Sequence, residues 1–294
     1  MSRLFKSKLR IALAAALAVV ALLAAWAFWL EPASLAVRRV SLRVPGWRAE
    51  HAGLKVALLT DLHVGAPHMS LGRLRRVVER TNDEAPDVVL ITGDFVIGGP
   101  QDKGGERGGV AGGTFVEPEP IAGELKHLRA PLGVYAVLGN HDWWFDGGRV
   151  TRALEGAGLR VLENGAARVE RGGRALWLAG VADLWTRRPD VEAALREVPA
   201  GDPVILFTHN PDIFPGVPAR VSLTVAGHTH GGQVNLPLLG RPVVPSRFGQ
   251  RYAFGHVEEG GRHLYVGGGV GTSIIPVRFR VPPEVVVLSL EPEG

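Results

Sequence analysis

Polar clusters that combine aspartate, histidine and asparagine recur five times along the chain, each directly after an apolar run. These side chains are the ones that bind divalent metal ions and move protons. The clusters are Asp61-Leu62-His63, Gly93-Asp94, Gly139-Asn140-His141-Asp142, Thr208-His209-Asn210 and Gly227-His228-Thr229-His230. Any one of them alone has an ordinary interpretation as a helix cap, a turn or a buried hydrogen-bonded histidine. Five clusters in the same setting favour a shared site.

The apolar runs before these clusters predict buried strands in a chain of alternating strands and helices. We expect strands at 55–60, 87–92, 133–138, 175–181, 203–207, 222–226, 263–266 and 285–290. Helices are expected at 119–128, 148–157 and 190–197, and from a cap at Ser70 to about Asp83. In sheet-based α/β folds, ligands bind beyond the carboxyl ends of strands. Seven side chains are therefore expected to converge: Asp61, His63, Asp94, Asn140, His209, His228 and His230.

Two carboxylates, four imidazoles and one amide exceed the three or four ligands of a single tetrahedral zinc site. The set suits two divalent ions that share one bridging carboxylate. The chain has no cysteine, which excludes disulfides and iron–sulfur clusters. Nitrogen and oxygen ligands without thiolate suit manganese, iron, zinc or cobalt.

The order of these motifs resembles the calcineurin-like metallophosphoesterase superfamily over roughly residues 53–290. The resemblance is closer for a bacterial subgroup of membrane-anchored, phosphodiesterase-like proteins. Three further runs carry it: GHTHGGQVNLP (227–237), PSRFGQRYAFG (245–255) and GTSIIPVRF (271–279). The resemblance implies an α/β (α+β) fold, a four-layer αββα sandwich of two mixed β-sheets flanked by helices.

The resemblance also implies a role for each candidate residue. One metal ion would be held by Asp61, His63, Asp94 and His230, and the other by Asp94, Asn140, His209 and His228, with Asp94 as the bridge. His141 would contact the phosphate and protonate the leaving oxygen as the catalytic acid. A hydroxide held between the two ions would attack phosphorus, because bound metal lowers the pKa of water to about 7.

Two positions depart from the wider family pattern. Many members carry a second aspartate in the run G-D-x-x-D, whereas this chain has Gly93-Asp94-Phe95-Val96-Ile97. Many members read G-N-H-E, whereas the fourth residue here is Asp142. Asp142 either substitutes as the residue that orients His141 or caps a turn, and both interpretations stay open.

Other residues near the motifs are expected to support the ligands or contact the substrate. They are Asp142, Trp143, Trp144, Asn210, Gln233, Arg247 and Arg251, with Phe145 and Tyr252 beside them. The aromatic run 143–145 forms either an apolar wall for a lipid or other large organic group, or part of the core. For the two arginines, contact with phosphate competes with ordinary surface ion pairs.

The N-terminus has the composition of a membrane segment. Residues 11–30 contain no polar side chain, and twenty helical residues rise about 30 Å, the thickness of a bilayer core. We expect an uncleaved single-pass transmembrane anchor in preference to a cleaved signal peptide. Residues 1–10 would then be a basic flank, 31–52 a linker and 53–294 the catalytic domain. Arg10 abuts the span, which predicts a cytoplasmic N-terminus and a catalytic domain outside the cytoplasmic membrane.

The net charge of +4 divides unevenly along the 294 residues. Residues 1–50 hold eight basic and two acidic side chains, and the remainder holds 25 basic and 27 acidic ones. The body therefore has no basic track for a polyanion, so no nucleic acid is expected as a partner and a nuclease ranks low. The Gly-rich run 98–113 predicts a surface loop, either an inert insertion or an active-site lid.

Together these features predict a binuclear-metal-dependent phosphoester hydrolase, a phosphodiesterase that acts near the membrane surface. A lipid-linked phosphoester is one candidate substrate. The alternatives are a phosphomonoesterase or nucleotide hydrolase of the extracytoplasmic space, a nuclease, and a non-catalytic metal-binding module.

Overall fold

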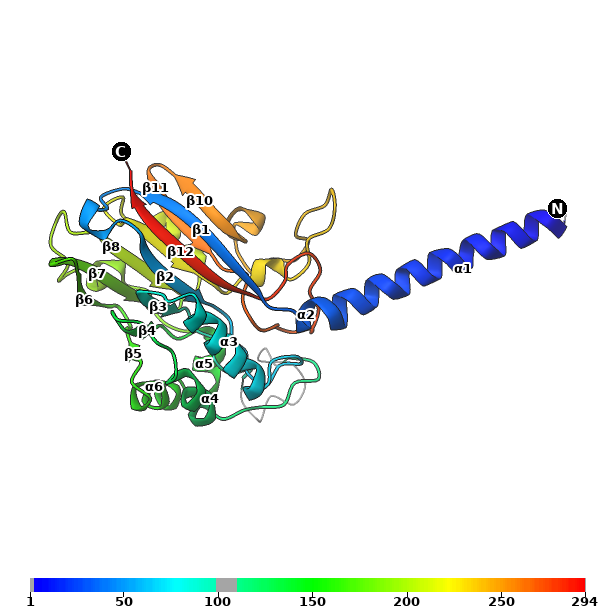
Figure 1. The fold of residues 1–294 in the computed structure, drawn as a ribbon, viewed down its shortest axis with the longest axis horizontal. Helices are drawn as coiled ribbons and strands as arrows, with labels where there is room; N and C mark the ends of the chain where they lie inside the picture. Colours follow the sequence, from blue (N-terminus) through cyan, green and yellow to red (C-terminus); the bar gives the residue numbers. More distant parts are fainter. Residues whose placement is uncertain (1–2, 99–109, 294) are drawn as a thin grey trace.

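The chain forms a two-sheet body from which one long N-terminal helix extends (Figure 1). The computed structural model describes residues 3–98 and 110–293. Most of the expected Gly-rich loop, residues 99–109, lies outside the described residues.

The first sheet has six strands and is mixed. Its spatial order is β1 (Ala36–Val44), β12 (Glu284–Pro292), β2 (Leu54–Leu59), β3 (Val88–Ile91), β4 (Val134–Ala136) and β5 (Arg160–Val161). β12 and β2 pair antiparallel, and the other neighbours pair in parallel. β3 is buried on both faces, as its unbroken apolar sequence predicts.

The second sheet also has six strands. Its order is β10 (Gly255–Glu259), β11 (Arg262–Val266), β9 (Leu223–Ala226), β8 (Val204–Thr208), β7 (Arg174–Val181) and β6 (Gly165–Arg171). The four central strands run parallel, and the outer strands pair antiparallel.

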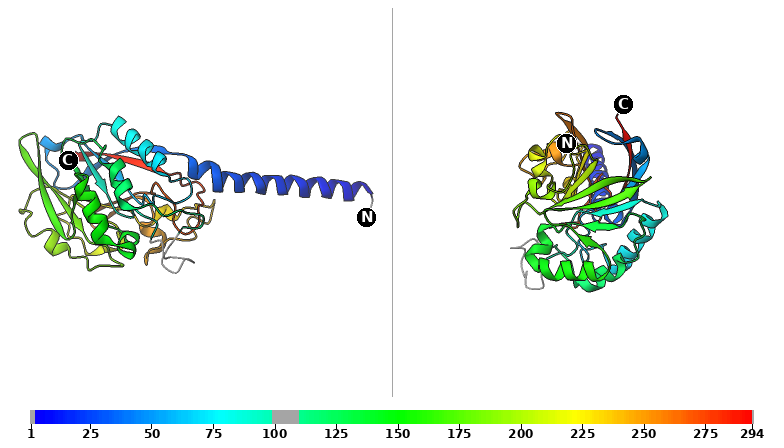
Figure 2. Two further views of the ribbon diagram at one scale, coloured as in Figure 1. Left: turned by 90° about the horizontal axis from the view of Figure 1, so that it is seen from below. Right: turned by 90° about the vertical axis from the view of Figure 1, so that its left-hand side faces the viewer.

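Three apolar cores hold the layers together, and the layers are seen edge-on in Figure 2. Leu58 and Leu90 of the first sheet share a core with Phe207 and Val225 of the second, so the two sheets stack face to face. On the outer face of the first sheet lie α3 (Leu71–Asp83), α4 (Pro118–Leu125) and α6 (Gly147–Gly156). The outer face of the second sheet is covered by α7 (Val191–Ala194) and the short 3-10 helix η3 (Pro211–Gly216). The predicted four-layer αββα sandwich is therefore confirmed.

Local sequence explains where these elements begin. The Ser70 hydroxyl accepts a hydrogen bond from the backbone N of Arg73, as expected for the cap of α3. Further short helices are α5 (Asn140–Phe145), η2 (Ala49–His51), η4 (His230–Gly232) and η5 (Gly249–Tyr252). The residues 36–44, expected to belong to a linker, form the edge strand β1. Its outward-facing arginines are typical of a protected sheet edge.

The N-terminal helix consists of α1 (Arg3–Ala25), a π-helical turn η1 (Trp26–Leu30) and α2 (Glu31–Ala33). In the part of the chain that the structure describes, Ser7–Ala33 is the one helix long and apolar enough to cross a membrane, with a mean hydropathy of 2.6 over its best window. Its last turns contact the body. The carbonyl of Ala27 accepts from the backbone N of Arg278 at 2.9 Å, and the Glu31 carboxylate accepts from the backbone N of Val281 at 2.5 Å.

Candidate metal centre

The seven predicted ligands meet where the carboxyl ends of strands from both sheets adjoin. Three come from segments that follow β2 and β3, three from segments that follow β8 and β9, and Asn140 begins α5. All seven side chains are buried: Asp61, His63, Asp94, Asn140, His209, His228 and His230. The convergence predicted from their positions after strands is thus present in the folded chain.

The first group of ligand atoms gathers around His63. Its Nε2 lies 3.0 Å from Nε2 of His230 and 3.4 Å from Oδ2 of Asp94. Nε2 of His230 lies 3.6 Å from Oδ1 of Asp61. Two imidazole nitrogens and two carboxylates therefore point at one small volume.

The second group gathers around His209. Its Nε2 lies 3.0 Å from Oδ1 of Asn140, 3.1 Å from Nδ1 of His228 and 3.3 Å from Oδ2 of Asp94. The same Asp94 oxygen is thus close to both groups. Asp94 would therefore be the residue able to hold an ion in each group.

The donor set and its spacing fit two divalent cations. Two ligand atoms bound at right angles, each about 2.1 Å from one ion, are about 3.0 Å apart. The nitrogen–nitrogen separations above have this value. In the His209 ring, Nδ1 lies 2.7 Å from the Thr92 carbonyl, which favours a proton on Nδ1 and leaves the lone pair of Nε2 facing the cluster. The other ring nitrogen of His228, Nε2, is buried without a hydrogen-bond partner.

Burial sets the ionisation of most of these histidines. It lowers the pKa of His63 to about 3 and lowers the pKa values of His228 and His230 well below their usual range. Burial acts in the same direction on His209, but the Asp94 carboxylate outweighs it and raises the pKa of His209 to about 10. Neutral imidazole is the form that binds metal, so a cation that binds at His209 has to displace a proton.

The ligands sit on strained backbone. Five of them have positive φ angles, in the region that non-glycine residues rarely adopt: Asp61 (51°), His63 (42°), Asp94 (55°), His228 (68°) and His230 (50°). Each such residue costs of order 1–3 kcal/mol, and strain of this kind clusters at functional sites. The surrounding contacts must therefore stabilise the ligand loops.

Two glycines of the motifs allow carboxylates to approach the backbone. A Cβ on Gly139 would overlap Oδ1 of Asp94, and one on Gly227 would lie 2.6 Å from Oδ2 of Asp61. The absence of a Cβ at these two positions leaves room for the carboxylates to accept hydrogen bonds. The backbone N of His141 donates to Asp94 Oδ1 at 2.9 Å, and the backbone N of His228 donates to Asp61 Oδ1 at 2.9 Å. The motif glycines thus orient both carboxylates.

Asp142 holds the Asp94 loop against the start of α5. Its Oδ2 accepts from the backbone N of Asp94 at 2.8 Å and of Gly139 at 2.9 Å. Its Oδ1 accepts from Phe95 at 2.8 Å and from Val96 at 3.2 Å. These contacts are those of a helix cap that also fixes a ligand loop.

We expect Asp142→Ala to lower the free energy of unfolding by about 3 kcal/mol or more, because four buried N–H groups lose their acceptor. Asp146→Ala is the matched control. Asp146 is exposed and accepts one backbone hydrogen bond at the start of α6, so its loss should cost about 1 kcal/mol. Denaturant unfolding of both variants measures the difference, and equal losses would contradict this role of Asp142.

Arg278 is a supporting residue that the sequence reasoning missed. Its buried guanidinium donates to the carbonyls of Gly268, Gly269, Gly271 and Val281. The backbone N of Gly271 in turn donates to the Asp61 carbonyl at 2.8 Å. Arg278 therefore braces the loop behind Asp61. The run GTSIIPVRF (271–279), which contains Arg278, was the sequence feature that could have identified it as a supporting residue.

A cavity of about 390 Å³ opens onto the ligand cluster. Asp94, Asn140, His141, His228 and His230 form its polar end, and its lining also includes Trp144, Trp185 and Gln233. The ring of Trp144 lies 4.9 Å from that of His141, and the ring of Trp185 lies 4.2 Å from that of His228. Trp185 was not predicted. Its signal is the run Asp183-Leu184-Trp185, which follows β7 as Asp61-Leu62-His63 follows β2.

The aromatic run 143–145 divides between the two predicted environments. Trp144 lines the cavity, whereas Trp143 and Phe145 are partly buried against the core below the first sheet. The guanidinium of Arg187 covers the Trp143 ring at 4.4 Å, and Phe145 contacts Phe115 at 4.9 Å.

Two predicted supporting residues have structural partners near the cluster. The amide oxygen of Asn210 accepts from the backbone N of Asp212 at 2.9 Å and so caps η3. The Gln233 amide donates to the carbonyls of Ser273 and Ile275 and accepts from the backbone N of Ser273. Gln233 thereby fixes the wall of the cavity that residues 273–275 form.

The structure does not bring the two predicted arginines to the cluster. The Arg247 guanidinium donates to the Asp212 carbonyl at 2.8 Å, and Arg251 pairs with Glu259 at 2.6 Å. The Tyr252 hydroxyl also donates to Glu259, at 2.8 Å. None of the three is among the described residues that line the cavity.

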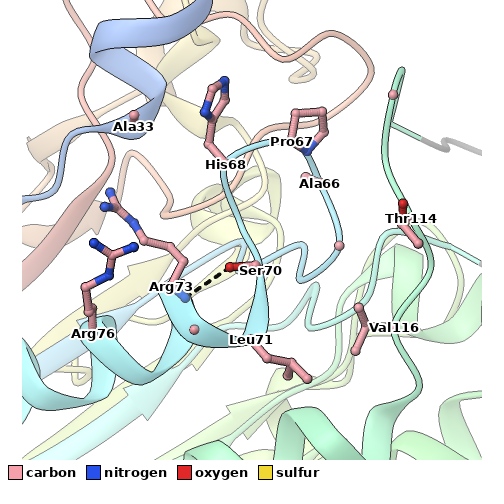
Figure 3. Close-up of a pocket in the computed structure, with 13 residues that line it drawn as sticks. Ala33, Ala66, Pro67, His68, Ser70, Leu71, Arg73, Arg76, Thr114 and Val116 are labelled. Atoms are coloured by element: carbon pink, nitrogen blue, oxygen red, sulfur yellow. Dashed lines mark hydrogen bonds between the residues drawn. The ribbon is translucent and has the colours of Figure 1, made fainter.

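A second, larger cavity of about 780 Å³ lies between the end of the N-terminal helix and α3 (Figure 3). Ala33, His68, Arg73 and Arg76 are among its lining residues, and none of the seven ligands is. The Arg73 guanidinium donates to the carbonyl of Ser34, and His68 Nε2 lies 3.0 Å from the Phe28 carbonyl oxygen. This cavity is a basic recess beside the helix end, separate from the ligand cluster.

Comparison with known proteins shows which family and which proteins this chain resembles. Residues 54–232, which include all seven ligands, match the family model described as calcineurin-like phosphoesterase. The chain is similar to the uncharacterized metallophosphoesterase YkuE of Bacillus subtilis (strain 168), with 31% identity over 81% of this chain and 79% of YkuE. Phosphodiesterase YaeI of Escherichia coli (strain K12) is 29% identical over 84% of this chain and 86% of its own. A Danio rerio transmembrane protein with metallophosphoesterase domain is 30% identical over 81% of this chain and 53% of its own.

Proposed function

Because the chain belongs to the calcineurin-like phosphoesterase family, and is thus a metal-dependent phosphoester hydrolase, we propose that it hydrolyses phosphodiesters at a membrane surface. Membership of the family confirms the resemblance seen in the motifs. The observation that carries the proposal is the position of Asp94, whose Oδ2 lies 3.4 Å from His63 and 3.3 Å from His209 in two separate ligand groups.

Two divalent ions account for all seven ligands. Asp61, His63, Asp94 and His230 would hold one, and Asp94, Asn140, His209 and His228 the other. When bound, such ions supply a water of lowered pKa as nucleophile and neutralise charge on the phosphate oxygens. Manganese, iron, zinc and cobalt all suit this set of nitrogen and oxygen atoms.

His141 is the proposed acid for the leaving oxygen. It lines the cavity at its polar end, with its ring 4.6 Å from that of His63. Its backbone N donates to Asp94, and Asp142 caps the helix that carries it. The ring is therefore held beside the place where the phosphate must lie if it contacts both ion sites.

The cavity lining favours a diester over a monoester. No lysine or arginine is among the described residues that line it, whereas a phosphomonoester dianion is usually bound by such cations. A diester carries one negative charge and a second organic group, and the apolar part of the cavity has room for that group. The name of YaeI, a phosphodiesterase, agrees with this choice.

The N-terminal helix would anchor the enzyme in the cytoplasmic membrane with the body on the extracytoplasmic side. Its apolar length and its almost complete exposure outside the body support anchoring. The Danio rerio relative is named a transmembrane protein, which agrees.

Hydrolysis of bis(p-nitrophenyl) phosphate by the full chain tests the proposal. We expect EDTA to abolish release of p-nitrophenolate and Mn²⁺ to restore it, because the buried ligands require cations to form the site. We also expect a higher kcat/KM for this diester than for p-nitrophenyl phosphate. Activity that survives thorough chelation would contradict the metal dependence. A preference for the monoester would contradict the phosphodiesterase assignment.

A further inference from the structure

The cavity over the ligand cluster is apolar on the side away from the ligands. Its far wall consists of side chains without charge, among them Val243, Ile274, Ile275 and Val277. Ile274 is 65% exposed and Val243 is 72% exposed. Among residues 31–98 and 110–293, the exposed large hydrophobic side chains all belong to this wall, to Trp185, or to the tip of the adjoining hairpin at Leu238 and Leu239. The hairpin tip lies outside the cavity lining, whereas the exposed apolar wall of the cavity is the kind of patch that marks a binding surface.

This wall lies next to the end of the candidate membrane helix. The segment 273–277 lines the cavity, and Arg278, the next residue, donates its backbone N–H to the carbonyl of Ala27 in the helix. Three residues of extended chain span at most about 10 Å, so Ile275 lies within that distance of Arg278. Figures 1 and 2 both show the neighbouring gold segment, residues 235–245, at the end of the body from which α1 departs.

The helix end also carries the charge expected at a lipid headgroup layer. The 27 residues of the span rise about 40 Å, which exceeds the bilayer core of about 30 Å and brings the last turns to the headgroups. The exposed Arg76 lies beside this end in the basic recess, next to the buried Arg73 (Figure 3). Basic side chains at this level attract anionic lipid phosphates. With α1 placed across a bilayer, the mouth of the apolar cavity would therefore lie at the membrane surface.

We propose that the apolar part of the cavity binds a hydrocarbon chain of a lipid phosphodiester, which the enzyme draws from the membrane that holds α1. The inference rests on the proposed phosphodiesterase function and names its substrate class. In the reaction, an oxygen of water bonds to phosphorus and one ester P–O bond breaks. The departing oxygen takes a proton from His141, and the proton that the water gives up on attack restores His141. A phosphomonoester and an alcohol are the products.

Two p-nitrophenyl phosphodiesters that differ only in their alkyl group test this assignment. The probes are p-nitrophenyl ethyl phosphate and p-nitrophenyl octyl phosphate, the latter below its critical micelle concentration. The enzyme is the full chain in phosphatidylcholine nanodiscs, so the lipid present is the same for all variants. We expect kcat/KM for the octyl ester to exceed that for the ethyl ester at least about tenfold, because several methylene groups leave water.

The double variant Ile274→Ser/Ile275→Ser should lower this octyl-to-ethyl ratio at least about fivefold. The matched control Leu238→Ser/Leu239→Ser removes exposed apolar surface of similar size outside the cavity and should leave the ratio as in the wild type. Both pairs are exposed, and thermal unfolding checks that the variants fold. A wild-type ratio near one, or an equal fall of the ratio in both double variants, would overturn the assignment.

A second measurement tests whether the enzyme takes its substrate from the membrane that holds α1. Phosphatidyl-p-nitrophenol placed in the same nanodisc as the enzyme should release p-nitrophenolate, and faster than when it is supplied in separate nanodiscs. Equal rates would overturn the membrane source. Loss of activity towards both alkyl esters and bis(p-nitrophenyl) phosphate would instead contradict the phosphodiesterase function itself, so the two failures are distinguishable.

Discussion

Replacing Asp94 by asparagine is expected to lower kcat/KM for bis(p-nitrophenyl) phosphate by about 10³-fold or more. Its Oδ2 lies 3.4 Å from Nε2 of His63 and 3.3 Å from Nε2 of His209, one histidine of each ligand group. An amide NH₂ at that position cannot bind a cation, and the negative charge that balances two divalent ions is lost. Metal analysis of the purified variant should show fewer than two ions per chain.

Asp183→Asn provides the matched control for this result. Asp183 is also buried and also follows a strand at the same edge of the second sheet. Its Oδ2, however, accepts from the backbone N of Trp185 and Thr186 and so caps a turn, a role that asparagine also fills. The control should retain both ions. Full activity and full metal content in Asp94→Asn would refute the bridging role.

His141→Ala is expected to reduce kcat according to how much the leaving group needs a proton. For an alkyl leaving group the loss should be about 10²- to 10³-fold, the usual contribution of a general acid. For p-nitrophenolate, which leaves without protonation, the loss should be less than about tenfold. The comparison is made with dialkyl and p-nitrophenyl alkyl phosphates, and metal content should stay at the wild-type value.

The difference between the loss of kcat for alkyl leaving groups and that for p-nitrophenolate distinguishes proton donation by His141 from a merely structural role. A variant that misplaces the Asp94 loop would lose metal and would slow both substrates equally. An equal loss with retained metal would place His141 in phosphate binding instead, because that contact serves every leaving group alike.

The convergence of the candidate ligands was predictable because most of them directly follow an apolar strand. Asp61, His63, Asp94, His209 and His228 all lie just beyond runs whose unbroken hydrophobicity predicts burial. Strand ends in a mostly parallel sheet meet at one edge, so position along the chain implied proximity in space. The edge strand β1 was not predicted, because its three arginines, at positions 38, 39 and 43, are equally compatible with an exposed linker.

Contacts around the site were less predictable from sequence. Asp142 had two interpretations, and only its four backbone donors assign it to a cap. The division of Trp143 and Trp144 between core and cavity follows from their direction on a six-residue helix that sequence patterns did not indicate. Arg278 braces the Asp61 loop from a segment more than 200 residues away along the chain.

The order of residues along the chain was enough to indicate the candidate metal-ligating side chains, the absence of cysteine and the apolar N-terminal segment. These depend on residue types and on spacing within single strands and loops, which are local properties. The folded arrangement was needed to show which oxygen lies between the two ligand groups and which aromatic rings face the cavity. It also placed the apolar wall beside the helix end, because the contact between Ala27 and Arg278 joins segments whose proximity no local pattern encodes.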